Sequence, residues 1–331
     1  MKPSIAIIGA TGAVGSEFIS VLKHFNFQFE KLYLVASARS AGNVVSTPFG
    51  NLTVEDITYF DFSAVRYAFF TAGGNVSREW AKKAVEAGAT VIDNTSAFRM
   101  QDAVPLIVPE INLDSFSGQK LISNPNCSTI QLARALAPIR DAFGLSRVIA
   151  STYQAVSGAG MEGINALHSS LLNSEEAEEE ESGPFPRQIA HNVIPSIDRF
   201  MDNGFTFEEE KVRFESRKIL ELPDLFITCT AVRVPVFRGH SVAAYIETEH
   251  PIDVEGVKQA LRQAGVVVCD RQEDFPTPRT IKDCHSIYVG RIRKEPDSPT
   301  GLWLWVVADN LWVGAALNAV SIAKELESGA H

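Results

Sequence analysis

The sequence predicts an α/β protein with an N-terminal doubly wound, Rossmann-type parallel sheet and a second, α+β domain whose sheet is mixed and largely antiparallel. Three observations lead to this prediction. The chain has 331 residues, which is more than one domain normally needs. Its first half alternates short apolar runs with helical patterns, and its second half contains longer strand-like runs with few helices between them.

The first half has the βαβ alternation of a parallel sheet. Its strands are continuous apolar runs, as is typical of strands that are buried on both faces. Strands are predicted at 4–10, 31–37, 65–73, 90–95 and 120–124, and helices at 14–25 and 77–88. We expect a nucleotide-binding domain over residues 1–126.

The pattern changes after about residue 146. The runs SRVIASTYQAVSG, LFITCTAVRVPVF, SVAAYIETEH, SIYVGRIRKE and GLWLWVVADN are long and alternating, which favours a mixed or antiparallel sheet with helices on one face. A second domain is therefore expected over residues 127–310. A helix at about 311–331 is expected to return to the first domain. The glutamate-rich stretch 173–186 is interpreted as a helix end and a solvated loop without a function.

The composition excludes several classes of protein. The formal net charge of −10 argues against nucleic acid as a partner. The sequence has no run of about 18 apolar residues, so no membrane span is predicted. The N-terminus lacks a signal-peptide pattern, and a cytoplasmic location is therefore expected. The four cysteines have no metal-ligand spacing and are expected to be free thiols, and no metal site is predicted.

A glycine-rich run, GATGAVG, follows the first predicted strand and opens the first helix. Glycines permit a tight turn and a close approach of the backbone to phosphate, and the helix N-terminus supplies free N–H groups. This context predicts a dinucleotide site. Its expected cofactor-binding residues are Gly9, Thr11, Gly12, Ala13, Val14 and Gly15.

The end of the second strand indicates which dinucleotide is bound. An acidic residue normally binds the ribose 2′-hydroxyl of NAD at this place. Here the sequence has Ser37, Arg39 and Ser40 and no acid. Two hydroxyl groups and a guanidinium suit a 2′-phosphate, so the sequence favours NADP over NAD.

Cys127, within SNPNCSTIQL, is expected at or near the N-terminus of a helix, where the helix dipole stabilises a thiolate. A lone cysteine is more often structural than catalytic, so a nucleophile needs a partner. The candidate is His240 in VRVPVFRGHS, the only histidine in a glycine-rich, arginine-flanked setting. The residue pattern by itself leaves both interpretations of Cys127 open.

Ten short motifs, in order and nearly end to end, resemble the aspartate-β-semialdehyde dehydrogenase family. They include GATGAVG, VIDNTSAFRM, SNPNCST, YQAVSGAG, FESRKI, VRVPVFRGHS and DNLWVGAALNAV. The resemblance implies that Cys127 is the nucleophile that forms an acyl-thioester and that His240 is the acid/base. It implies that Gln154 orients the substrate near the thiol.

The resemblance also implies the substrate contacts. Arg233, rather than Arg238, would bind the α-carboxylate, and Glu215 would pair with the α-amino group. The implied phosphate-binding cations are Arg99 and Lys218. The implied contacts to the nicotinamide half of NADP are Ser157, Gly158 and Asn310.

The reaction implied by the resemblance is the reductive dephosphorylation of L-4-aspartyl phosphate to L-aspartate 4-semialdehyde and phosphate, in the pathway to lysine, methionine and threonine. A homodimer through the second domain is implied, with a homotetramer as a further possibility. Two alternatives remain open at this point: an enzyme like N-acetyl-glutamyl-phosphate reductase, and a non-catalytic paralogue that acts as a binding protein. Retention of Cys127, Gln154, Arg233 and His240 argues against the second.

Overall fold

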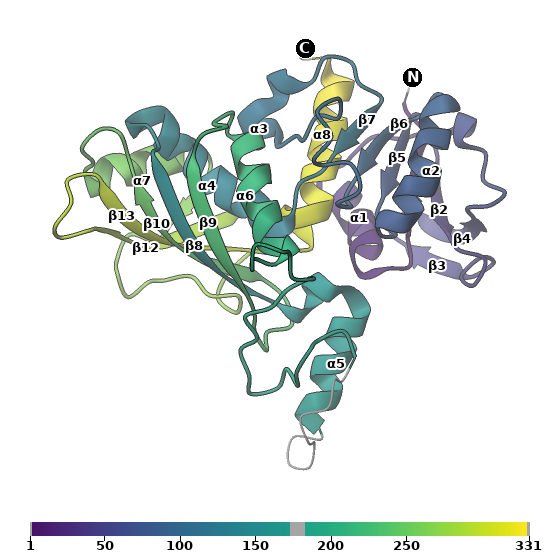
Figure 1. The fold of residues 1–331 in the computed structure, drawn as a ribbon. Coiled ribbons are helices and arrows are strands. Elements are labelled where there is room, and N and C mark those ends of the chain that lie inside the picture. The colour runs from purple at the N-terminus through teal and green to yellow at the C-terminus, as the bar shows by residue number, and fades with distance from the viewer. Residues whose placement is uncertain (1, 173–182, 330–331) are drawn as a thin grey trace. The chain divides into compact units, whose positions relative to one another are not determined.

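The protein is described here by a computed structural model that covers residues 2–172 and 183–329 (Figure 1). The glutamate-rich stretch at 175–181 lies outside the described residues. The chain divides into two compact units. Unit 1 comprises Met1–Asn126 and Ala315–His331, and unit 2 comprises Cys127–Gly314.

Unit 1 contains a seven-stranded sheet in the order β3-β4-β2-β1-β5-β6-β7. All neighbouring strands are parallel except β3 and β4, which form an antiparallel hairpin at one edge. The strands are β1 (Ile5–Ile8), β2 (Leu32–Ala36), β3 (Val44–Thr47), β4 (Gly50–Asp56), β5 (Tyr67–Phe70), β6 (Thr90–Asp93) and β7 (Leu121–Ser123). The doubly wound parallel sheet predicted from the sequence is confirmed.

The helices of unit 1 pack around this sheet. They are α1 (Ala13–His24), α2 (Gly74–Glu86), the short α3 (Pro109–Asn112) and α8 (Leu317–Ser328). An aromatic cluster that includes Phe62, Phe70 and Trp80 fills the space between α2 and the sheet. Helix α8, from the C-terminal end of the chain, packs against α1, α3 and β6 in the same unit. Its Asn318 donates hydrogen bonds from Nδ2 to the Ile107 carbonyl at 2.8 Å and to Asn124 Oδ1 at 2.7 Å.

Unit 2 contains a six-stranded sheet in the order β11-β12-β13-β10-β8-β9. Strand β8 is parallel to β9 and β11 to β12, and the three remaining pairs are antiparallel. The strands are β8 (Arg147–Gln154), β9 (Phe226–Arg233), β10 (His240–Glu247), β11 (Val267–Val268), β12 (Ile287–Lys294) and β13 (Gly301–Ala308). The predicted mixed, largely antiparallel sheet is confirmed.

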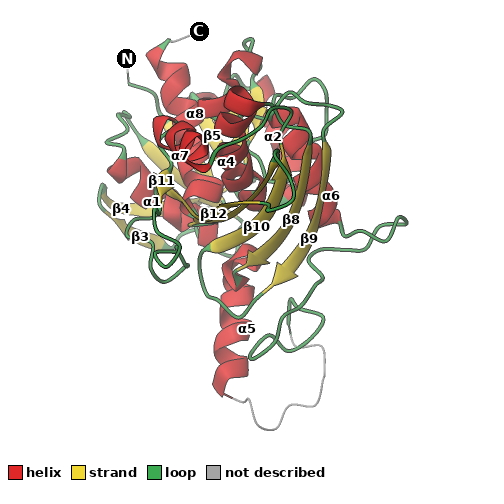
Figure 2. Cartoon of the chain, turned by 90° about the vertical axis from the view of Figure 1, so that its left-hand side faces the viewer, coloured by secondary structure: helices red, strands yellow, loops and turns green. Residues whose placement is uncertain are grey.

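Three helices cover one face of this second sheet: α4 (Cys127–Phe143), α6 (Phe207–Ile219) and α7 (Val254–Gln263). The alternating burial along strand β8 explains why only one face is covered. Its alternate residues Val148, Ala150, Thr152 and Gln154 are buried towards the helices, and the residues between them are exposed or half-buried. Helix α5 (Gly160–Leu172) extends away from the sheet, and Figure 2 shows β10, β8 and β9 side by side.

Candidate functional site

The glycine-rich loop of unit 1 lies between β1 and α1, where a Rossmann sheet binds its ligand. Strand β1 pairs with β2 on one side and with β5 on the other, so the strand order changes direction between β1 and β5. This is the topological switch point, where open α/β sheets bind ligands. Gly9 has φ +91°, and a Cβ there would lie 2.8 Å from the backbone nitrogen of Ala72. A Cβ on Gly15 would overlap the Gly9 carbonyl oxygen. Gly9 and Gly15 are therefore required by the close packing of this turn on itself and on the segment after β5.

The structure brings this loop next to the turn that the sequence assigned to the 2′-phosphate. Thr11 Oγ1 lies 3.4 Å from Ser40 Oγ, and the turn is closed by a 2.8 Å bond from the Ser40 backbone nitrogen to the Ser37 carbonyl. Arg39 is exposed on this turn. Ala13 and Val14 form the start of α1, whose N-cap Gly12 makes no side-chain cap. The glycine loop and the turn at 37–40 are thus joined through the hydrogen bond between Thr11 and Ser40.

Arg99 lies in the loop after β6 and is buried. Its Nε donates to the Asn124 carbonyl at 2.9 Å, and its Nη2 donates to the Asn94 carbonyl at 2.7 Å. These bonds join the carboxyl ends of β6 and β7. Asn124 precedes Cys127 by three residues, so Arg99 helps to hold the segment that leads to the thiol.

Three predicted side chains of unit 2 meet at one end of its sheet. Gln154 ends β8 and Arg233 ends β9, and the two residues are register partners. His240 begins β10, which runs antiparallel to β8 with Ser241 opposite Tyr153. Because neighbouring strands lie about 4.8 Å apart, an amide, a guanidinium and an imidazole are collected on adjacent strands.

The backbone of Ala155 holds two of these groups. Its N–H donates to His240 Nδ1 at 3.0 Å, and its carbonyl accepts from Arg233 Nη1 at 2.7 Å. Both partners are almost fully buried. A Cβ added to Gly158 would lie 2.7 Å from Arg233 Nη1 and 3.4 Å from His240 Nε2. Gly158 therefore leaves the space onto which the guanidinium and the imidazole open.

His240 is held in its neutral form. Burial, together with the positive charge of Arg233, lowers its pKa from 6.5 to about 3, although Glu208 and the Gly239 backbone partly oppose this shift. Because Nδ1 accepts from Ala155, the proton of the neutral ring is on Nε2. Nε2 is buried and has no hydrogen-bond partner among the described residues. It is a donor available to a substrate oxygen.

This depressed pKa predicts acid sensitivity that depends on His240. The unfolded chain takes up a proton near pH 6.5 and the folded chain does so only near pH 3, so stability is lost as pH falls between these values. His240→Asn keeps an acceptor for the Ala155 N–H. Between pH 6.5 and pH 5 the wild-type free energy of unfolding is expected to fall by about 2 kcal/mol more than that of the variant. Urea titrations at both pH values measure the difference.

The exposed His250 provides the control, since His250→Asn is expected to follow the wild-type pH dependence. Equal acid sensitivity of wild type and His240→Asn would contradict a buried neutral imidazole.

Cys127 is the first residue of α4 and is partly exposed. Its Cα and Cβ pack against Gly314, where an added Cβ would lie 2.5 Å from Cys127 Cβ. Gly314 was not among the residues predicted from the sequence. Burial lowers the pKa of Arg233, and the charges of Glu208 and Cys127 act in the opposite direction. The thiol therefore lies within electrostatic range of the buried guanidinium.

The three residues assigned to the nicotinamide side lie near the same edge. Ser157 and Asn310 are buried and hydrogen-bonded to each other, with Asn310 Nδ2 3.0 Å from Ser157 Oγ. Asn310 Oδ1 accepts from the backbone nitrogen of Gly239 at 2.9 Å, directly before His240. Arg238 instead forms an ion pair with Asp309. The two arginines of VRVPVFRGHS thus have different surroundings.

Helix α6 supplies a residue that the sequence analysis missed. Glu208, in its first turn, is buried and accepts a hydrogen bond from Gln154 Nε2 at 3.1 Å. The predicted Glu215 is also buried and lies seven residues further along, on the same face of the helix. Lys218 is half-buried one turn beyond it. The spacing gave a signal, because Glu208 and Lys211 repeat the Glu215 and Lys218 pattern one heptad earlier.

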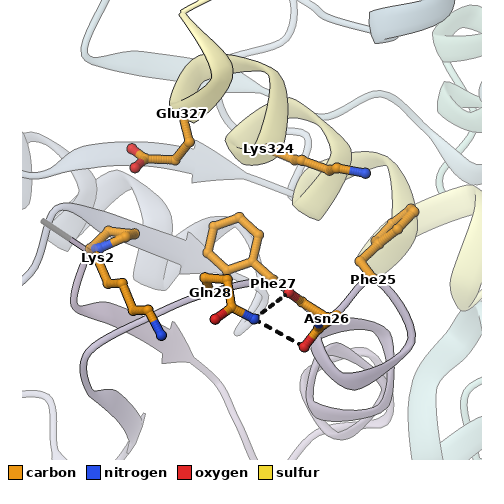
Figure 3. Close-up of a pocket in the computed structure, with 8 residues that line it drawn as sticks. Lys2, Phe25, Asn26, Phe27, Gln28, Lys324 and Glu327 are labelled. Atoms are coloured by element: carbon orange, nitrogen blue, oxygen red, sulfur yellow. Dashed lines mark hydrogen bonds between the residues drawn. The ribbon is translucent and has the colours of Figure 1, made fainter.

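Unit 1 contains a pocket of about 500 Å³ (Figure 3). It is lined by Lys2, Pro3, Phe25, Asn26, Phe27, Gln28, Lys324 and Glu327. Lys2 and Pro3 precede β1, so the pocket is at the amino ends of the strands, opposite the edge where dinucleotides bind.

Within the described residues, no group of three or more His, Cys, Asp or Glu side chains could hold a metal ion. No helix in residues 2–172 and 183–329 is long and apolar enough to cross a membrane. All four cysteines are free, as predicted.

A dinucleotide-type parallel sheet, combined with a mixed-sheet unit that carries a thiol and an imidazole, defines a two-domain dehydrogenase. Two family models match the chain: the semialdehyde dehydrogenase NAD binding domain over residues 4–119, and the semialdehyde dehydrogenase dimerisation domain over residues 136–313. The chain is 47% identical to the aspartate-semialdehyde dehydrogenase of Bacillus subtilis over an alignment of 335 positions, gaps included, which covers 98% of this chain and 97% of that protein.

Solved structures agree. The crystal structure of aspartate semialdehyde dehydrogenase II complexed with ASA from Vibrio cholerae has a TM-score of 0.94 and 45% identity, and covers 99% of each chain. The aspartate semialdehyde dehydrogenase with NADP from Candida albicans has a TM-score of 0.78 and 26% identity over 99% of each chain. The chain belongs to the aspartate-semialdehyde dehydrogenase family. The predicted family, fold and enzyme class are confirmed, together with a nicotinamide-dinucleotide domain.

Proposed function

We propose that the chain catalyses the NADP-dependent, reversible reductive dephosphorylation of L-4-aspartyl phosphate to L-aspartate 4-semialdehyde and phosphate, through an acyl-thioester on Cys127. One observation supports this most strongly. The buried Arg233 guanidinium is within electrostatic range of Cys127 and shares the Ala155 backbone with His240. This arrangement supports Arg233 as the carboxylate clamp, Cys127 as the nucleophile and His240 as the proton donor of a single site.

The reaction starts when the Cys127 thiolate attacks the acyl carbon of the substrate. A C–S bond forms, the C–O bond to phosphate breaks, and phosphate leaves with the bonding electrons. When bound, the nicotinamide supplies the hydride that reduces the thioester carbon. The His240 Nε2–H donates to the oxygen on which negative charge develops. Collapse of the hemithioacetal breaks the C–S bond, releases the aldehyde and returns the thiolate.

The charges of the substrate match the predicted binding residues. Arg233 suits the planar α-carboxylate by bidentate contact, and Glu215 suits the α-ammonium group. Arg99 and Lys218 are the cations proposed for the phosphate. An N-acetylated substrate has no ammonium charge, so a buried glutamate such as Glu215 favours aspartyl phosphate.

The experiment that tests this function is the reverse reaction. Protein, aspartate semialdehyde and NADP are mixed with and without phosphate, and reduced nicotinamide is followed by absorbance. Phosphate-dependent reduction is expected. Well-folded protein that reduces neither NADP nor NAD would contradict the proposal, and N-acetyl-glutamate semialdehyde would then be tested as the next substrate.

The preference for NADP rests on Ser37, Arg39 and Ser40, which lie beside the glycine loop. Arg39→Leu is expected to raise the KM for NADP by about tenfold to a hundredfold and to leave the KM for NAD nearly unchanged, because only NADP carries the 2′-phosphate. Steady-state kinetics with both cofactors measure this.

Arg66→Leu is the matched control, since Arg66 precedes β5 at the amino ends of the strands. Equal effects of Arg39→Leu on the two cofactors would contradict the assignment of Arg39.

The uncovered face of the unit 2 sheet is proposed as the dimer interface. Ile149, Tyr153 and Phe226 are 43%, 37% and 51% exposed there. Tyr153 packs on Trp305 with ring centroids 5.4 Å apart, which adds a large aromatic surface. Contiguous exposed apolar surface of this kind marks an association site. A dimer formed through this face agrees with the dimerisation-domain match over residues 136–313. A tetramer and a cytoplasmic location stay predictions.

Ile149→Glu is expected to raise the dimer dissociation constant at least about a hundredfold, because dimerisation would bury an unpaired charge. Sedimentation equilibrium measures the change. Val44→Glu, at an exposed position of β3 in unit 1, is expected to leave the dimer intact. A dimer that tolerates Ile149→Glu at the same concentration would exclude this face.

A further inference from the structure

Glu208 contacts Gln154 directly and contributes a buried charge beside the site. The residue is 4% exposed, in the first turn of α6. Its Oε1 accepts from Gln154 Nε2 at 3.1 Å, and its Oε2 pairs with Lys211 Nζ at 2.7 Å. Lys211 is also paired with Asp198 at 3.1 Å. A buried carboxylate that is hydrogen-bonded on one side and ion-paired on the other has a fixed orientation.

This contact decides which end of the Gln154 amide faces the reaction. The amide nitrogen has two donors, and they are used by Glu208 Oε1 and by Thr152 Oγ1 at 3.3 Å. An inverted amide would place its carbonyl oxygen against the Glu208 carboxylate, which offers only acceptors. The inverted orientation is therefore disfavoured. The Gln154 carbonyl oxygen is left as the atom that can accept a hydrogen bond from the substrate.

We propose that Glu208 is a positioning residue that acts through Gln154, fixing the amide so that its carbonyl oxygen, and not its NH₂ group, meets the reacting substrate. Lys211 holds the carboxylate in place through its ion pair. This inference rests on the proposed function, because it assigns a cause to the orientation of Gln154 in that reaction.

The test compares Glu208→Gln with a control on the same helix. A glutamine at 208 can present either oxygen or nitrogen to Gln154, so both amide orientations become possible. Glu210 is also buried, but it pairs with Arg213 at 2.8 Å and accepts a hydrogen bond from Asn203 Nδ2 at 2.8 Å, and neither partner belongs to the site. Glu210→Gln thus removes an equivalent charge from α6 without touching Gln154.

In the phosphate-dependent assay, Glu208→Gln is expected to lower kcat by about tenfold to a hundredfold, the cost of misplacing a reacting group. The KM for aspartate semialdehyde is expected to change less than about twofold, because Arg233 keeps its hydrogen bond to the Ala155 carbonyl. Glu210→Gln is expected to retain wild-type kcat. Rates are normalised to the alkylatable Cys127 thiol in each preparation, so that a loss of folded protein does not count as a loss of turnover.

The decisive comparison uses a Gln154→Ala background. If Glu208 acts through Gln154, adding Glu208→Gln to Gln154→Ala changes kcat by less than about twofold, since the amide to be oriented is gone. A loss of equal size in both backgrounds would overturn the proposal and make Glu208 a structural or independent charge. Wild-type kcat for Glu208→Gln would overturn it as well. Absence of turnover in wild type and Glu210→Gln would instead contradict the proposed function.

Discussion

Replacing Cys127 with serine is expected to reduce kcat of the phosphate-dependent reaction by at least about 10⁴-fold. The site suits a nucleophile that is not activated by His240. His240 keeps its proton on Nε2, because Nδ1 accepts from Ala155, and burial holds its pKa far below neutrality. It therefore cannot act as a base for a serine hydroxyl. The measurement is the rate of NADP reduction with aspartate semialdehyde and phosphate.

A matched control is available in the same unit. Cys269 is a half-buried free thiol that follows β11, an edge strand of the unit 2 sheet, and its backbone N–H donates to β12. Cys269→Ser is expected to keep wild-type activity, and Cys127→Ser is expected to keep wild-type affinity for NADP. Substantial turnover by Cys127→Ser would rule out the thioester route.

Arg233→Lys is expected to lower kcat/KM by about 10²- to 10³-fold. Lysine retains the charge but cannot make a bidentate contact to a carboxylate while also donating to the Ala155 carbonyl. Most of the loss should appear in KM for the aldehyde, because the clamp binds substrate and transition state alike. Steady-state kinetics with varied aldehyde at saturating phosphate and NADP separate the effect on KM from the effect on kcat.

Arg238→Lys provides the comparison. Arg238 lies five residues away, is 38% exposed in its side chain, and is paired with Asp309. Its replacement is expected to change kcat/KM by no more than about threefold, the scale of a partly exposed ion pair. Similar losses for both substitutions would refute the assignment of Arg233 as the specific carboxylate clamp.

The strands of the parallel sheet were predictable because they are apolar on both faces. The predicted run 65–73 contains β5, and 90–95 contains β6, with errors only at the ends. The hairpin β3–β4 was missed. Of its eleven residues only Val54 is buried, so no apolar period marks these strands in the sequence. An edge hairpin is stabilised by backbone pairing, which side-chain patterning reports poorly.

The site residues whose side chains can carry out chemistry by themselves were predictable from the sequence. A cysteine before a helix and a histidine after a glycine stand out in the sequence, and their assigned roles stay predictions. Ala155 and Gly314 do not stand out, and the only sequence signal of Glu208 is that Glu208 and Lys211 repeat the spacing of Glu215 and Lys218, because the importance of all three residues comes from contacts over long sequence separations. Gly314 lies against Cys127, and Glu208 against Gln154. Ala155 contributes only backbone atoms, so its side chain carries no signal.

The peptide groups of Ala155 have a consequence for how this site can change. One residue fixes both the group proposed to recognise the carboxylate and the group proposed to handle the proton. A backbone shift that adapts the clamp to a longer or shorter substrate would also move the imidazole. A change of substrate range is therefore expected to reduce turnover at the same time. In laboratory evolution toward longer or shorter substrates, the lost turnover should be restored first by substitutions next to His240.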